Sequence, residues 1–246
     1  MPSIQSPKRI CVFTSTTVGR SPAHTDAARD LAKALSNHSA ELIYGAGTTG
    51  LMGELSKTLV ELSGKDSVQG VIPLAILPIE RPESTRATTR EARPLEKKRW
   101  TDRLGFAARL HKPVITPDNP PRQPALLSEE KYGMTTVVPS LSARKQLMCN
   151  LTSLGAPGSG FVALSGGFGT MDELMEMITW RQQGVHNCRI CLYNVEGFWD
   201  LLLAWIESAI QRGFVREQVR DWVGEGRTGE ECLRWLAEGN GVKNST

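Results

Sequence analysis

The stretch that decides the class of fold is residues 161–182, which read FVALSGGFGTMDELMEMITWRQ. Residues 161–164 form a short, continuously apolar run typical of a buried strand, and residues 170–182 carry apolar side chains at helical spacing. Three glycines lie between them and permit a tight connection. The stretch therefore predicts a β-strand that passes directly into an α-helix.

The same alternation of strand and helix runs outward in both directions. We expect further strands at 9–15, 40–44, 69–77, 135–138 and 189–193, and further helices at 23–37, 51–62, 142–154, 198–211 and 228–237. Continuously apolar strands that alternate with helices indicate a parallel sheet covered on both faces. The prediction is one α/β domain over residues 1–246 with a doubly wound, Rossmann-like sheet, whose ligands bind beyond the carboxyl ends of the strands.

Residues 81–131 interrupt this alternation. They contain seven prolines and twelve Lys or Arg against seven Asp or Glu. A connection of this length inside a compact domain is unusual. We expect a solvated, basic, Pro-rich insertion, with a second domain or a partner-binding arm as the alternatives.

Composition excludes several classes of protein. The 246 residues are 40% hydrophobic and 22% charged, with a net charge of +3, which is ordinary for a globular chain. This charge is too small to indicate a nucleic-acid or membrane-surface partner. No apolar run is long enough to cross a bilayer, and the polar residues 1–8, with two prolines, do not resemble a signal peptide.

The five cysteines are an odd number and do not suggest a disulfide framework. Cys188 and Cys191 have CxxC spacing, but they lie at a predicted strand, so we expect buried strand cysteines rather than a redox pair. No second Cys or His pair completes a zinc site. The sequence therefore predicts no metal and a reducing, cytoplasmic compartment.

Two glycine-rich turns are candidate ligand sites. Residues 45–50 spell GxGxxG after a strand, which suits either a phosphate or simply close helix–strand packing. Asp66 lies before the next strand, so the match to a nicotinamide or flavin site is incomplete. Residues 165–173 read SGGFGTMDE, and this turn can hold an anion with Glu173 one helical turn away. Alternatively, Thr170 and Glu173 form a capping box.

Several stretches together resemble the Lonely Guy (LOG) family of cytokinin riboside 5′-monophosphate phosphoribohydrolases. Residues 165–173 match its PGGxGTxxE signature except that Ser165 replaces Pro, and residues 44–53 match YGGGxxGLMG except at Ala46. The family's Arg-Lys pair, with a Met three residues on, is present as Arg144, Lys145 and Met148. Its ITWxxxGxH run is matched by residues 178–186, and its NVxG[FY][YW] run by residues 194–199. The resemblance covers most of residues 8–214 apart from the insertion.

This chain also departs from the family pattern. Residues 14–17 read TSTT where relatives have a Gly, and Ser142 and Ala143 stand in place of His-Glu or His-Gln before Arg144. These changes affect the expected substrate preference more than the reaction type.

The resemblance implies hydrolysis of the N-glycosidic bond of N6-modified adenosine 5′-monophosphates. Such a reaction needs a carboxylate for the oxocarbenium-like sugar, an anchored phosphate and a cation. It implies Glu173 and Arg144 as catalytic residues and no cofactor or metal. The residues expected to bind substrate are Glu80, Lys145, Gly166, Gly167, Phe168, Gly169, Thr170, Met171, Asp172 and Thr179. We expect Gly169 to have a positive φ or to touch the ligand.

The sequence also leads to expectations about assembly and leaves alternative functions open. The resemblance implies a homodimer, for which Leu174, Met177 and Ile178 offer an apolar surface, and no nucleic-acid or membrane partner. On spacing alone, Arg144 and Lys145 suit a solvated helix face. The rival functions are a broader nucleoside-monophosphate hydrolase acting on AMP and a non-catalytic nucleotide-binding protein. A nicotinamide-dependent oxidoreductase and a lysine decarboxylase are weaker rivals.

Overall fold

The computed structural model describes residues 6–79 and 128–238, which all belong to one compact unit. Most of the predicted insertion, and with it Glu80, lies outside the described residues. Its last residues, predicted as loop, begin the short helix α3.

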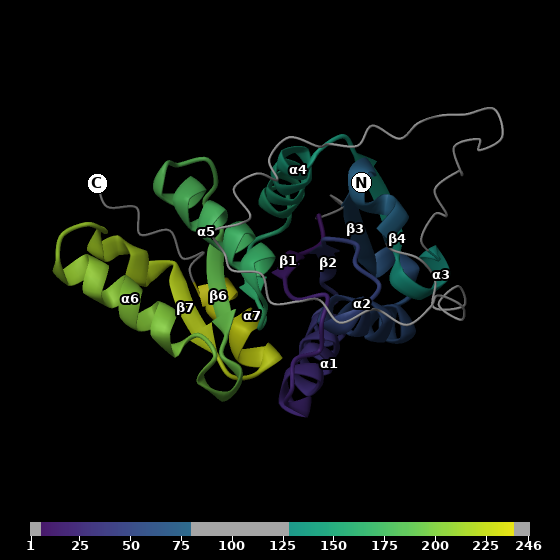
Figure 1. Cartoon of the computed structure of the whole chain (residues 1–246), viewed down its shortest axis with the longest axis horizontal. Helices are drawn as coiled ribbons and strands as arrows, with labels where there is room; N and C mark the ends of the chain where they lie inside the picture. Colours follow the sequence, from purple (N-terminus) through teal and green to yellow (C-terminus); the bar gives the residue numbers. More distant parts are fainter. Residues whose placement is uncertain (1–5, 80–127, 239–246) are drawn as a thin grey trace, which may run out of the picture. The chain divides into compact units, whose positions relative to one another are not determined.

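The predicted doubly wound α/β fold is confirmed (Figure 1). Seven parallel strands form one sheet in the order β4-β3-β2-β1-β5-β6-β7. The strands are β1 (Arg9–Phe13), β2 (Glu41–Tyr44), β3 (Val68–Pro73), β4 (Met134–Val138), β5 (Gly160–Ala163), β6 (Arg189–Tyr193) and β7 (Val223–Gly226). The helices are α1 (Pro22–Asn37), α2 (Gly50–Ser63), α3 (Glu129–Tyr132), α4 (Leu141–Ser153), α5 (Phe168–Gln182), α6 (Asp200–Gln211) and α7 (Gly229–Glu238).

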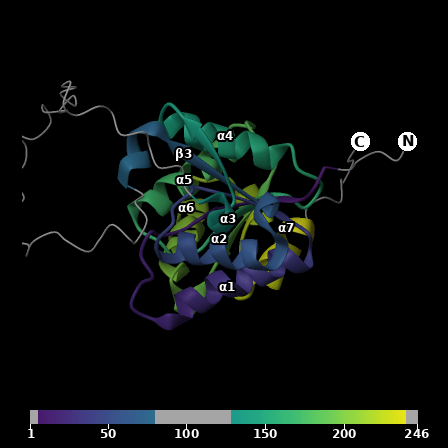
Figure 2. The ribbon, with the colours of Figure 1, turned by 90° about the vertical axis from the view of Figure 1, so that its right-hand side faces the viewer.

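Helices cover both faces of the sheet because successive strand residues point to opposite sides. In β1, Ile10 and Val12 pack with α1, α2 and α7, whereas Cys11 and Phe13 pack with α4, α5 and α6. Figure 2 shows α1 and α2 on one side of the sheet and α4 on the other. Because apolar clusters cover both faces of the central strands, β1, β2, β5 and β6 read as almost continuous apolar runs.

The direction in which successive strands are added to the sheet reverses between β1 and β5. From β1 the chain adds β2, β3 and β4 on one side, and then returns to place β5, β6 and β7 on the other. The carboxyl ends of β1 and β5 therefore form the switch point at which doubly wound sheets bind ligands.

Element ends differ from prediction in identifiable ways. The predicted strand 69–77 stops at Pro73 and continues as the 3₁₀ turn Leu74–Ile79. Further 3₁₀ turns occupy Lys65–Ser67, Val195–Gly197 and Glu217–Asp221. Strand β7 was not predicted, because its sequence VGEG lacks β-branched and aromatic enrichment beyond one valine.

The five cysteines are free, and the prediction of buried strand cysteines is confirmed for Cys191 but wrong for Cys188. Cys11, Cys149, Cys191 and Cys232 are buried, and Cys188 is half-buried just before β6. Across residues 6–79 and 128–238 we find no cluster of three metal-ligating side chains. In the same ranges, no helix has both the length and the apolar character needed to cross a bilayer.

Candidate active site

The signature turn connects β5 to α5 at the switch point. Helix α5 begins at Phe168 with Gly167 as its N-cap, and no side chain caps it. Its first backbone N–H groups are therefore not satisfied by a capping side chain, which suits an anion. The capping-box interpretation of Thr170 and Glu173 is wrong, since Thr170 already lies inside the helix.

The glycines of this turn have different roles. A Cβ on Gly166 would lie 2.0 Å from Thr170 Oγ1, so packing requires a glycine there. A Cβ on Gly167 or Gly169 would meet nothing within 4 Å. Gly169 also does not have the positive φ that we considered, because the positive-φ glycines are elsewhere. Gly167 and Gly169 therefore face open space, where a ligand can approach the backbone.

The other glycine turn, residues 45–50, is closed by its own chain. A Cβ on Gly50 would lie 2.1 Å from the backbone of Thr16, and one on Gly47 would lie 2.7 Å from Met52 Sδ. Thr49 Oγ1 donates to the carbonyl of Thr16 at 3.2 Å, which fixes the turn against the β1–α1 loop. These contacts favour the packing interpretation of GxGxxG over a second phosphate site.

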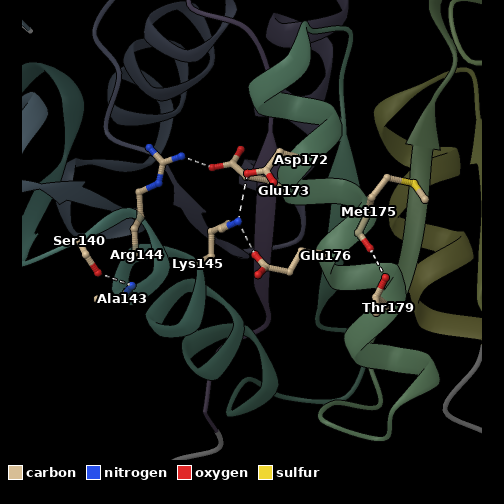
Figure 3. Close-up of polar contacts among 9 residues, drawn as sticks. All are labelled: Ser140, Ala143, Arg144, Lys145, Asp172, Glu173, Met175, Glu176 and Thr179. Carbon is tan, nitrogen blue, oxygen red and sulfur yellow. Dashed lines mark hydrogen bonds and ion pairs between the residues drawn. The ribbon is translucent and has the colours of Figure 1, made fainter. Parts of the chain in front are cut away.

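Glu173 and Arg144 form a buried ion pair (Figure 3). Arg144 Nη2, from α4, donates to Glu173 Oε1, from α5, and their side chains are 12% and 3% exposed. Gly45 lies next to the pair, since a Cβ there would be 3.4 Å from Arg144 Nη1. The low exposure of Arg144 excludes a solvated helix face for this residue.

Burial dominates the electrostatics of Glu173. Loss of solvent raises the pKa of the Glu173 carboxyl above its ordinary value, and the neighbouring Arg144 cation offsets only part of this rise. Arg144 Nε is buried and has no hydrogen-bond partner among residues 6–79 and 128–238. The pair therefore retains an unused donor beside its carboxylate.

Lys145 is held by carboxylates rather than by solvent. Its Nζ contacts Asp172 Oδ2 at 3.0 Å and Glu176 Oε2 at 2.7 Å, and its side chain is 13% exposed (Figure 3). Burial lowers the pKa of Lys145, but the two carboxylates outweigh it and the net shift is upward. Lys145 stays charged and fixes α4 against α5.

Of the remaining predicted site residues, Phe168, Met171, Asp172 and Thr179 lie on the outer surface of α5, whereas Thr170 is buried. Thr179 Oγ1 donates to the carbonyl of Met175 at 2.8 Å (Figure 3). An open depression of about 520 Å³ on this surface is lined by Phe168, Met171, Asp172, Met175, Glu176, Thr179, Trp180 and Gln183. The predicted substrate residues of α5 are therefore divided between the turn and this depression.

The prediction that Leu174, Met177 and Ile178 form a dimer surface is wrong. Leu174, Met177 and Ile178 are 0%, 1% and 6% exposed and belong to the core beneath α5. They are buried because they face the sheet, and the stripe that faces outward begins at Phe168, which is 97% exposed.

A smaller pocket of about 260 Å³ lies on the β1 side of the signature turn. It is lined by Ser15, Thr17, Val18, Gly19, His24, Leu51, Ser165, Gly166, Gly167 and Phe198. Sequence reasoning missed His24, which was one of four scattered histidines. The substitution of Ser165 for the family's Pro was the signal that pointed here, because Ser165 Oγ lies 3.0 Å from His24 Nδ1.

This fold and site define a Rossmann-like protein with an arginine–carboxylate centre beside an open helix-terminal turn. The solved structures agree on the fold. A molybdenum cofactor binding protein from Rippkaea orientalis has a TM-score of 0.54 at 14% identity, covering 96% of this chain and 98% of that one. A molybdenum cofactor carrier protein from Chlamydomonas reinhardtii has a TM-score of 0.54 at 13% identity, covering 95% and 98%.

Sequence comparisons give the family. The family model described as "possible lysine decarboxylase" matches residues 52–234. A probable cytokinin riboside 5′-monophosphate phosphoribohydrolase of Oryza sativa subsp. japonica is 31% identical over 94% of this chain and 79% of the relative. A cytokinin riboside 5′-monophosphate phosphoribohydrolase of Arabidopsis thaliana is 29% identical over 94% of this chain and 82% of the relative. The chain therefore belongs to the LOG family, which its sequence motifs had indicated.

A longer relative is also similar. A bifunctional cytokinin biosynthesis protein of Fusarium pseudograminearum is 39% identical over 209 residues, which are 85% of this chain. The chain spans only about a third of that protein, since the match covers 36% of its length.

Proposed function

We propose that this protein hydrolyses the N-glycosidic bond of N6-modified adenosine 5′-monophosphates and releases the free cytokinin base and ribose 5-phosphate. The observation that carries this proposal is the buried Arg144–Glu173 pair beside the open turn at Gly167 and Gly169. The names of the relatives support the same reaction.

In the proposed mechanism each group has a distinct task. The turn binds the 5′-phosphate through backbone N–H groups at the start of α5. The carboxylate of Glu173 stabilises positive charge that develops on the ribosyl carbon, or positions the attacking water. Arg144 offsets part of the effect of burial on that carboxylate and presents a cation to the substrate.

The two rival functions differ in their products. A broader enzyme would hydrolyse AMP as fast as N6-modified nucleotides, and a non-catalytic nucleotide-binding protein would release no base. The test incubates the protein separately with isopentenyladenosine 5′-monophosphate, AMP and unphosphorylated isopentenyladenosine, and measures the free base. We expect release from the modified monophosphate but not from the nucleoside. No release from any of them would overturn the proposal.

We further propose a single-domain, cytoplasmic homodimer, in which residues 81–131 are an insertion. The exposed apolar side chains of α6, Leu201 and Trp205, support the dimer because they are one turn apart and are 86% and 54% exposed. We therefore propose Leu201 and Trp205 as dimer contacts in place of Leu174, Met177 and Ile178, which are buried.

The dimer prediction is tested by placing charged side chains on the exposed apolar surface of α6. We expect light scattering to give twice the chain mass for the native protein and the single chain mass for the double variant Leu201→Lys, Trp205→Glu. Phe214→Lys is the matched control, since Phe214 is 85% exposed but lies beyond the end of α6. A native monomer at working concentration would contradict the dimer.

A further inference from the structure

The 260 Å³ pocket between the β1–α1 loop and the signature turn has a composition suited to an anion. Its lining offers the hydroxyls of Ser15, Thr17 and Ser165, the backbone of Gly166 and Gly167, and one imidazole, His24. No carboxylate belongs to the described lining, so an anion entering the pocket is not repelled at contact range.

The His24 ring is held in one orientation. Its Nδ1 lies 3.0 Å from Ser165 Oγ, and its ring meets Phe198 edge-on at a centroid distance of 6.1 Å. On another side, Gly19 comes so close that an added Cβ would lie 3.0 Å from His24 Cδ2. These contacts restrict the rotamers of His24, so its second nitrogen has a fixed direction.

Ser165 is itself fixed. It is 5% exposed, and its carbonyl accepts a hydrogen bond from Thr14 Oγ1 at 3.2 Å. When the Ser165 hydroxyl donates to Nδ1, the proton of the neutral imidazole resides on Nε2. His24 Nε2 has no hydrogen-bond partner within the described part of the chain, and it is therefore available as a donor.

We infer that His24 is a specificity-determining residue that binds the phosphate monoester of the substrate through Nε2, with Ser165 as its positioning residue. This inference rests on the proposed function and adds a side-chain donor to the backbone donors of the turn. Glu173 follows Gly167 by six residues, about 9 Å along the axis of α5. A ligand with its phosphate at this pocket can thus extend its sugar toward the carboxylate.

The test measures binding of ribose 5-phosphate by calorimetry, which does not depend on hydrolysis. His24→Asn retains an atom that can bond to Ser165 but loses the donor in the pocket, whereas His24→Gln retains a donor near the position of Nε2. We expect His24→Asn to weaken binding about tenfold to a hundredfold, as for other hydrogen bonds to charged groups. His24→Gln should keep most of the affinity, and ribose itself should bind weakly to every variant.

Two further variants make the test specific. Ser165→Ala removes the orienting hydroxyl and should also weaken binding, by less than His24→Asn does. His38→Gln is the control, because His38 caps the opposite end of α1 and pairs with Glu230 there. Melting temperatures verify that each variant is folded, and Ser165→Ala replaces His24→Asn in the comparison if the latter unfolds.

The possible outcomes separate this inference from the proposed function. The role of His24 would be overturned if His24→Asn bound ribose 5-phosphate as tightly as the native protein does. It would also be overturned if His24→Asn bound more tightly than His24→Gln, or if the native protein did not bind ribose 5-phosphate at all. A native protein that binds ribose 5-phosphate through His24 but releases no base from monophosphates would overturn the proposed reaction alone.

Discussion

Replacing Glu173 with glutamine is expected to lower the rate of glycosidic hydrolysis by about two orders of magnitude or more, with the fold intact. Glutamine keeps the size of the side chain and an oxygen that accepts the Arg144 hydrogen bond. What it loses is the negative charge that stabilises the oxocarbenium-like state. The measurement is kcat for the variant beside its melting temperature.

The melting temperature of this variant carries independent information. Because the pKa of Glu173 is raised in the fold, the fold favours its neutral form. The resulting stabilisation is present below the ordinary pKa of glutamate and is lost as the pH rises through the raised pKa. At neutral pH, glutamine should therefore not lower the melting temperature. Glu207→Gln, an exposed carboxylate on α6, is the control. Full activity with a lower melting temperature would make Glu173 structural.

Substituting Gly169 with valine is expected to abolish most binding of the monophosphate and leave the weak binding of the nucleoside nearly unchanged. The new side chain enters open space, so it displaces ligand rather than protein. Loss of two hydrogen bonds to a charged phosphate corresponds to a weakening of about a hundredfold or more. Calorimetric titration of AMP and adenosine against both proteins measures this difference.

Gly166→Ala is the matched variant at the same turn. Its Cβ would overlap Thr170 Oγ1, so it should destabilise the fold by about 1–3 kcal/mol rather than act only on the ligand. If Gly169→Val instead weakened both ligands equally, the turn would be merely structural. The assignment of the phosphate site to this turn would then be wrong.

Periodicity in the sequence was sufficient to predict the centre of the sheet, because β1, β2, β5 and β6 are almost continuously apolar and buried on both faces. It could not predict β7, whose residues gain strand conformation only by pairing with β6, as between Tyr193 and Gly226. Nor could it predict that the strand ending at Pro73 continues as a 3₁₀ turn. Such features depend on tertiary contacts rather than on local pattern.

The site was predictable only in part, for a similar reason. Arg144 and Glu173 are 29 residues apart, and His24 and Ser165 are 141 residues apart. Spacing alone favoured a solvated face for Arg144, and only the family resemblance indicated a catalytic role for it; its ion pair with Glu173 was not predicted. For Leu174, Met177 and Ile178 the apolar character was clear from sequence, but the sequence did not show which side of α5 faces the sheet.

The central claim is tested most directly by measuring both products from isopentenyladenosine 5′-monophosphate in one reaction. Cleavage of the glycosidic bond predicts isopentenyladenine and ribose 5-phosphate in equal amounts, with no inorganic phosphate. Isopentenyladenosine with inorganic phosphate would mean that the phosphate ester is cleaved instead. That result would contradict the assignment of Glu173 and Arg144 to the ribosyl carbon.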